Sequence, residues 1–169
     1  MASVKVIVKQ NNAKLILSRL PRGRVVAGLP ANSGSYDTGE SVVDVGFKNE
    51  YGSRELGIPS PISYDGHKSR VTVSAIPERS FMRSTFGDEH KGWAKDVADN
   101  IPLLLEGISK PDVLIGTMGA IMERAIKAKI RSINTPENSP QVQTDKGSNN
   151  PLIDTGKMIQ SITHEVRND

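Results

Sequence analysis

The stretch DVLIGTMGAIMERAIKAKIRSI, residues 112–133, has the most regular hydrophobic pattern in the chain. Its apolar side chains recur at spacings of three and four residues, which places them on one face of an α-helix. Asp112 stands in the expected first turn and Arg131 in the last, as the dipole of a helix favours. We therefore expect one long amphipathic helix here, with the rest of the fold packed against its apolar face.

The segments on either side of this helix have both strand and helix patterns. Residues 24–29 and 70–75 are rich in valine and residues 162–166 alternate with a period of two, so each predicts a short strand. Residues 40–51 and 79–108 have helical spacings instead. This mixture indicates an α+β fold, in which a small and mostly antiparallel sheet is packed against helices.

Glycine and proline predict where two of these helices end. Gly52 follows residues 40–51 at the position of a C-terminal cap. Pro102 lies inside residues 79–108, and we expect it to break or kink the helix there because proline has no N–H to donate.

The length of 169 residues predicts a single domain over 1–169. Residues 1–10 are expected to form an N-terminal arm. Residues 53–69 and 134–150 are long and polar, with few apolar side chains to bury, so we expect two loops that contact other subunits.

Composition and charge exclude some classes of protein. The absence of cysteine excludes disulfides, thiolate metal sites and cysteine nucleophiles. No apolar run approaches the roughly 18 residues of a membrane-spanning helix, so we expect a soluble chain with no export signal and no contact with a membrane.

The net charge is +3, and residues 1–36 contain Lys5, Lys9, Arg22 and Arg24 but no acid. This segment could bind nucleic acid, remain a solvated face, or pair with an acidic neighbouring subunit.

The triplet Asp154-Thr155-Gly156 is also found at the catalytic turn of aspartic peptidases. Those enzymes need two carboxylates that share a proton at about 3 Å, so this chain would have to act as a dimer. Only 13 residues follow Gly156, too few to complete such a fold, and the cation of Lys157 would disturb the shared proton. A dimeric aspartic peptidase is therefore a remote alternative.

A structural role explains the same residues. Pro151 ends the preceding loop, Leu152 and Ile153 dock into the core, and Asp154 or Thr155 offers a side-chain oxygen that caps a short helix over 157–162.

No other catalytic, cofactor or metal site is indicated. The histidines His67, His90 and His164 lie in dissimilar segments and form no metal-binding spacing. We therefore expect no enzyme activity, no cofactor, no metal and no small-molecule substrate.

Three further segments have sequences distinctive enough to compare with known families. VGFKNEYG, residues 45–52, closes a helix with Asn49, Glu50, Tyr51 and Gly52. IPERSFMRSTF, residues 76–86, begins with an extended turn at Ile76-Pro77 that leads into a helix. In that segment we expect Ser80 to cap the helix and Phe81 to anchor it in the core. NPLIDTGKMIQSI, residues 150–162, contains the triplet discussed above.

In this order, the three segments resemble the minor tail, or tail-completion, proteins of tailed bacteriophages, over roughly residues 20–166. The resemblance implies a virion protein of the neck, made in the cytoplasm of the host bacterium. It implies a ring of six or twelve copies that contacts head–tail connector proteins on one side and tail tube or terminator proteins on the other. Non-specific contact with the DNA that passes through such a ring is compatible with it.

The resemblance assigns no catalytic residue. Residues 53–75, with their predicted strand, stand where a typical member has a short loop. The main alternative function is a nucleic-acid-binding protein that uses the basic N-terminal segment.

Overall fold

A computed structural model describes residues 23–53, 76–146 and 150–168. The expected N-terminal arm, the strand over 70–75 and nearly all of the loop over 53–69 lie outside the described residues.

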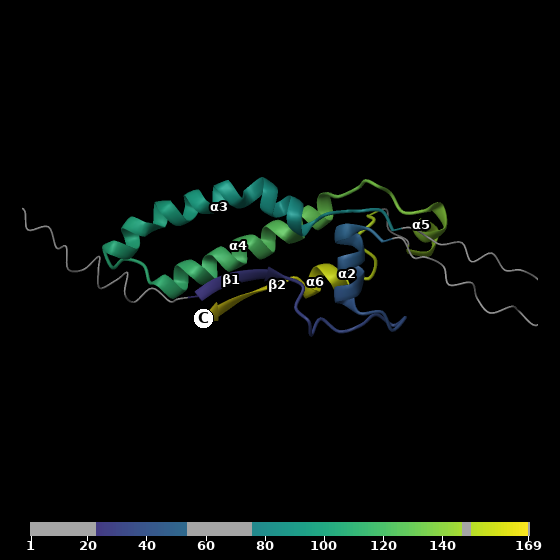
Figure 1. The fold of residues 1–169 in the computed structure, drawn as a ribbon, viewed down its shortest axis with the longest axis horizontal. Coiled ribbons are helices and arrows are strands. Elements are labelled where there is room, and N and C mark those ends of the chain that lie inside the picture. The colour runs from purple at the N-terminus through teal and green to yellow at the C-terminus, as the bar shows by residue number, and fades with distance from the viewer. Residues whose placement is uncertain (1–22, 54–75, 147–149, 169) are drawn as a thin grey trace, which may run out of the picture.

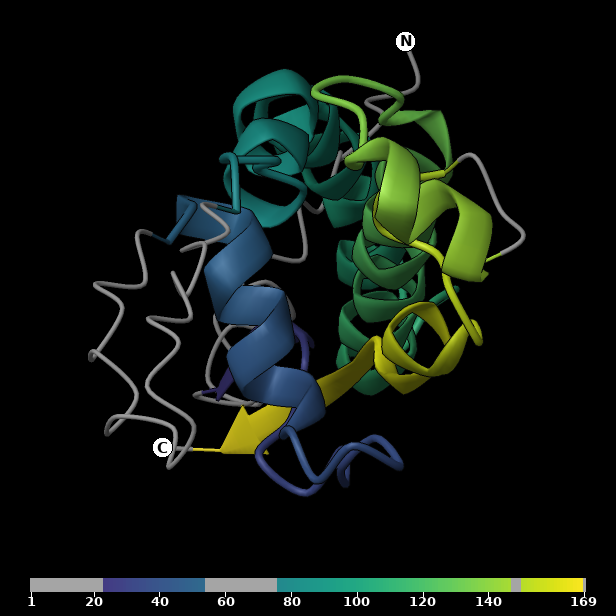
Figure 2. The same ribbon diagram turned by 90° about the vertical axis from the view of Figure 1, so that its right-hand side faces the viewer.

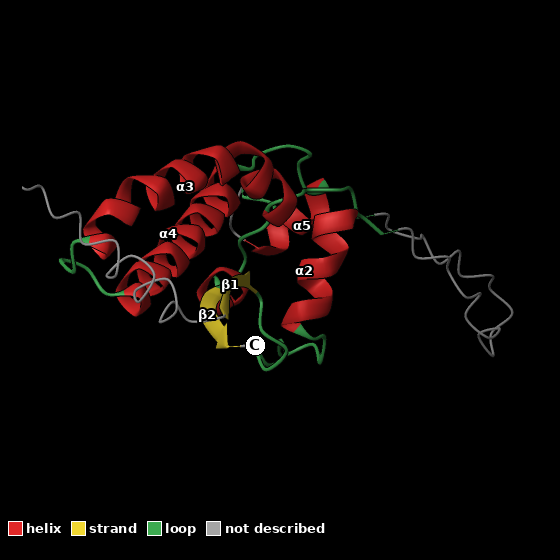
Figure 3. Ribbon diagram, turned by 60° about the vertical axis from the view of Figure 1, so that its left-hand side comes forward, coloured by secondary structure: helices red, strands yellow, loops and turns green. Residues whose placement is uncertain are grey.

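Two antiparallel strands and several helices form the described part of the molecule, which confirms the predicted α+β fold (Figure 1). In chain order the elements are β1 (Gly23–Gly28), α2 (Val42–Tyr51), α3 (Met82–Leu105), α4 (Pro111–Ser132), α5 (Pro140–Lys146), α6 (Lys157–Ser161) and β2 (Thr163–Asn168). The longest two, α3 and α4, lie side by side as a helical hairpin (Figure 3).

The sheet lies along α4 and joins distant parts of the chain. Gly23 of β1 pairs with Asn168 of β2, and the register runs to Gly28 opposite Thr163. A glycine lets the sheet approach the helix closely, since a Cβ atom on Gly119 of α4 would stand 2.3 Å from Cδ2 of His164. The same histidine contacts Glu123 of α4 through Nδ1, at 2.7 Å. The absence of a side chain at Gly119 thus brings β2 onto α4.

The core lies where the second half of α4 meets α2, α6 and the start of α3 (Figure 2). Its buried apolar side chains are Val42, Phe81, Ile126, Ile130, Leu152, Met158 and Ile162. Leu152 is 6% exposed and Phe81 is fully buried, which confirms the expected docking of Leu152 and the expected anchor at Phe81. The hydrophobic face predicted for residues 112–133 supplies the α4 part of this core.

Two expectations about element boundaries need correction, and at Pro102 the correction applies to the expected break. Pro102 does not break α3, which continues to Leu105. Proline removes only the one hydrogen bond that its own nitrogen would donate, and the helix continues past it, since the N–H of Glu106 bonds to the carbonyl of Pro102 at 2.9 Å. The supposed loop over 134–150 contains α5, and its first residues are held by the contacts of Arg79 described below.

Candidate functional site

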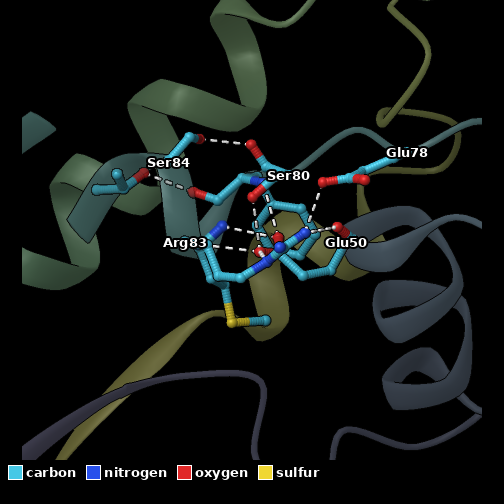
Figure 4. Close-up of polar contacts among 8 residues, drawn as sticks. Glu50, Glu78, Ser80, Arg83 and Ser84 are labelled. Atoms are coloured by element: carbon cyan, nitrogen blue, oxygen red, sulfur yellow. Dashed lines mark hydrogen bonds and ion pairs between the residues drawn. The ribbon is translucent and has the colours of Figure 1, made fainter. Parts of the chain in front are cut away.

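A buried carboxylate from α2 caps the first turn of α3 (Figure 4). Glu50 is 3% exposed, and its oxygens accept hydrogen bonds from the backbone N–H groups of Phe81 at 2.7 Å, Met82 at 2.9 Å and Arg83 at 2.9 Å. The hydroxyl of Ser80 donates to the same carboxylate at 2.8 Å. The first N–H groups of any helix lack partners within it and carry partial positive charge, so a carboxylate is well matched to them.

This arrangement corrects the role predicted for Ser80. Phe81 occupies the N-cap position of α3 and no side-chain cap from that residue is present. The hydroxyl of Ser80 does not accept from the helix; it donates to Glu50, which performs the capping from another element.

The environment of Glu50 favours its charged form. Burial alone would raise the pKa of this carboxyl, but hydrogen bonds from the backbone of Met82 and Arg83, the hydroxyl of Ser80 and the backbone of Phe81 outweigh burial. The pKa of Glu50 therefore lies below its usual value, and the side chain is ionised at neutral pH.

Arg83 closes this cluster on its solvent side. Its Nε donates to Glu50 at 3.1 Å, while Nη2 donates to the backbone carbonyl of Glu50 at 2.8 Å and to the carboxylate of Glu78 at 2.7 Å. The guanidinium also lies over the ring of Tyr51, 4.4 Å from its centroid. One side chain of α3 thus contacts both the backbone and an aromatic ring at the end of α2.

A second buried side chain, Arg79, binds α2 to the segment after α4. Its backbone N–H donates to the carbonyl of Asn49 at 2.7 Å, and Nη1 donates to the side-chain oxygen of Asn49 at 3.3 Å. Nε donates to the carbonyl of Pro136 at 2.7 Å, and Nη2 to Glu137 O at 2.9 Å and Asn138 Oδ1 at 3.1 Å. Burial lowers the pKa of Arg79. A planar guanidinium with several donors suits this fixed set of carbonyl oxygens.

Gly52 allows the first two segments to meet backbone to backbone. Its φ of 72° lies in the left-handed region, and a Cβ there would stand 3.1 Å from the nitrogen of Glu78 and 3.2 Å from the oxygen of Ile76. The next residue, Ser53, exchanges two backbone hydrogen bonds with Ile76, both at 2.9 Å. The predicted C-cap is therefore confirmed, and Gly52 also allows this close approach.

The third segment joins the same structure through α4. The amide of Asn150 donates to the carbonyls of Ile130 and Arg131 in the last turn of α4, at 3.2 and 3.1 Å. Its side-chain oxygen accepts from the N–H of Leu152 at 2.9 Å. Pro151 and Leu152 are buried behind this contact.

The prediction that Asp154 or Thr155 would cap the short helix α6 is wrong for Asp154, while Thr155 makes one contact of this kind. Asp154 is exposed, and the N-cap of α6 is Gly156, with a φ of 79° and no side-chain cap. Thr155 does accept a hydrogen bond from the N–H of Lys157, at 3.3 Å. The triplet is a glycine turn whose exposed carboxylate is not engaged in capping.

A small cavity of about 210 Å³ lies between α2 and this turn. Tyr36, Asn49, Asp154, Lys157 and Met158 are among its lining residues. Burial, followed by the nearby charge of Asp154, raises the pKa of Tyr36. Pockets that hold cofactors or substrates usually measure about 300–1,000 Å³, so this one is small for such a ligand.

The three histidines and the basic N-terminal residues named above lie partly outside the described ranges. His90 contacts the carbonyl of Phe86 in its own helix at 2.9 Å, His164 lies against Glu123, and His67 is not described. Within 23–53, 76–146 and 150–168, no three acidic, histidine or cysteine side chains are grouped so that they could hold a metal ion. None of the helices seen in those ranges is long and apolar enough to cross a bilayer. Lys5, Lys9 and Arg22 are not described.

The contacts of Glu50, Arg79 and Asn150 could not be found by reading the sequence. Each residue lies in one of the three specific segments, which is the only sequence signal for its importance. In comparisons with known proteins, no family model matches the chain, and no curated protein or solved structure matches it significantly.

Proposed function

We propose that the chain is a non-enzymatic structural protein of a phage virion, assembled as a ring at the junction of head and tail. The observation that carries this proposal is the convergence of the three specific segments on one structural junction. Their polar side chains bond to helix ends and carbonyl groups of the fold, as Glu50, Arg79 and Asn150 illustrate. Residues used in this way hold elements together, which suits a protein whose task is assembly.

The exposed surface supports the same proposal. Large apolar side chains are exposed on α2 and α3 and in the turn that joins α3 to α4, with Phe47 at 63%, Phe86 at 60% and Ile108 at 70%. Grouped apolar exposure of this kind marks interaction sites more often than solvent-facing surface. A ring subunit needs such surfaces, because each copy contacts two neighbours and the layers above and below it.

The direct test is to purify particles of the phage that encodes the chain and to measure their protein composition by mass spectrometry. We expect the chain in intact particles at a fixed copy number of six or twelve, and in isolated necks seen by electron microscopy. Particles made without the chain should yield heads and tails that do not join. Complete, infectious particles that lack the protein would disprove the proposal.

A further inference from the structure

Six aliphatic side chains are exposed at the closed end of the α3–α4 hairpin, where the two helices are connected. They are Val97, Ile101, Leu103, Leu105, Ile108 and Val113, and we call them the tip patch. Ile108 and Val113 are the most exposed, at 70% and 58%. Figures 1 and 3 show this end of the hairpin far from α2 and α5. So many uncovered aliphatic groups at one end of the molecule indicate a contact with another protein surface.

A different apolar surface lies at the other end of α3, and we call it the base patch. It comprises Phe47, Tyr51, Arg83, Phe86 and His90. The rings of Phe47 and Tyr51 lie 4.7 Å apart, the guanidinium of Arg83 covers Tyr51, and Phe86 stacks on His90 at 5.4 Å. Arg83 and Phe86 are one helical turn apart, which joins the two aromatic pairs into one surface.

The two patches can be occupied at the same time. Phe86 and Ile101 are 15 positions apart in α3, which corresponds to about 22 Å along a helix. A subunit can therefore present its tip to one neighbour and its base to another.

Charge distinguishes the two ends of the hairpin. The tip half, residues 94–119, has two lysines and four acids, a net charge of −2. The base half, residues 82–93 and 120–132, has six lysines and arginines and three acids, a net charge of +3. Tip against tip or base against base would bring like charges together, whereas tip against base brings opposite charges together.

We infer that the tip patch of one copy of this chain docks on the base patch of a second copy. The occupant of both surfaces is then the chain itself, and the contact is head to tail, the type that closes into a ring. This inference rests on the ring assembly in the proposed function, but not on the location of that ring in a virion. It adds which surfaces meet and which residues carry the contact.

The test uses the full-length protein with one exposed side chain changed in each patch. Phe86→Ser removes an exposed ring of the base patch, and Ile108→Ser removes the most exposed group of the tip patch. Val26→Thr is the matched control, since it removes an exposed apolar group from the sheet, outside both patches. Circular dichroism and thermal melting should show all three variants folded like the wild type. Masses are then measured by native mass spectrometry and light scattering over a range of concentrations.

The wild type and Val26→Thr should form the same closed oligomer. Phe86→Ser and Ile108→Ser should each weaken association at least about tenfold and remain monomeric at concentrations where the wild type assembles. An equal mixture of the two variants should form a dimer and nothing larger, because only one intact tip and one intact base remain to pair.

Any of three results would overturn the inference: a wild type that stays monomeric, single variants that assemble like the wild type, or a mixture that forms no dimer. The virion experiment is a separate measurement. A chain found in particles whose ring survives both substitutions would retain the proposed function and lose this contact. A chain absent from particles that still shows the mixing result would lose the virion location and retain the contact.

Discussion

Replacing Glu50 by alanine is the most direct test of how the fold is held together. The carboxylate is 3% exposed and accepts three backbone hydrogen bonds from the first turn of α3, one from Ser80 and one from Arg83. Removing it leaves buried N–H groups without a partner and removes the charge that faces the positive end of the helix.

The size of the effect follows from these contacts. Hydrogen bonds to charged groups contribute about 1.5–3 kcal/mol each, although a shared acceptor makes them non-additive. Breaking a buried charged cluster by removing one partner typically costs about 3–5 kcal/mol. We therefore expect Glu50→Ala to lower the free energy of unfolding by about 3–5 kcal/mol, and the melting temperature by about 6–20 °C for a chain of this length.

The assay is thermal and urea unfolding followed by circular dichroism, with Glu78→Ala as the matched control. Glu78 bonds to the same guanidinium as Glu50, but its side chain is 55% exposed. An exposed ion pair contributes at most about 1 kcal/mol, so the control should be close to the wild type. If the two variants lost similar amounts of stability, capping by Glu50 would not be a principal support of the fold.

Four further predictions concern single residues. Hydrogen bonds hold the pKa of Glu50 below its usual 4.5 in the folded protein. The stabilisation of the fold by the ionised carboxylate is therefore complete above pH 4.5 and is lost as the pH falls through the folded pKa. The free energy of unfolding of Glu50→Gln should fall less steeply with acid than that of the wild type, and parallel curves would contradict this. Arg79→Lys should lower the free energy of unfolding by about 2–3 kcal/mol, because a lysine cannot reach four acceptors, and an unchanged urea midpoint would contradict the role of its guanidinium. Gly119→Ala should lower the free energy of unfolding by about 1–3 kcal/mol, because its Cβ collides with His164 of β2. The control Gly116→Ala, with nothing within 4 Å of its Cβ, should raise that free energy by up to about 1 kcal/mol. Thermal melts in which Gly119→Ala is the more stable of the two variants would refute the close packing of β2 on α4. Asp154→Asn should change the melting temperature by less than corresponds to about 0.5 kcal/mol, because this exposed carboxylate caps no helix, and loss of a measurable peptidase activity in this variant would revive the enzymatic alternative.

The sequence predicts local elements well, because the period of a helix or strand is contained in a short stretch. The expected segments 24–29, 40–51, 112–133 and 162–166 each correspond to an element whose ends differ by at most two residues. In residues 112–133, two side chains that set the period, Met118 and Ile126, are buried, whereas Phe47 and Tyr51, which set the period of residues 40–51, are exposed.

The contacts between elements could not be predicted in this way. Ser80 has the right composition for a helix cap, but a better acceptor from 30 positions earlier, Glu50, occupies the site. The segment after α4 looked like a loop because it has few apolar groups of its own, and Arg79, 57 positions earlier, supplies the donors that hold it. Both errors have one cause: hydrogen-bonding partners far apart in the chain are not visible in a local pattern.

The prediction for Asp154 shows that a local pattern can also mislead. Asp and Thr are both good capping residues, and both stand just before a short helix. In the structure, Gly156 adopts a left-handed conformation between them and the helix, so the chain turns before the carboxylate can reach the first N–H groups. The local rule about residue type therefore fails for Asp154, whereas Thr155 still accepts a hydrogen bond from the N–H of Lys157.

The pairing of β1 with β2 sets the order in which the chain can fold during synthesis. The partners Gly28 and Thr163 are 135 positions apart, which corresponds to about 7–27 s of translation at typical bacterial and eukaryotic rates. The contact between α3 and α4 joins two helices that follow each other in the chain and can form early, but the face of α4 that receives the sheet stays uncovered until β2 has been made. During that interval, Ile126 and Ile130 also lack Leu152, Met158 and Ile162, the members of the same core cluster that stand just before β2 in the chain, and are open to aggregation or to a chaperone. The yield of folded protein should therefore depend on translation speed and temperature more than the stability of the finished molecule would suggest.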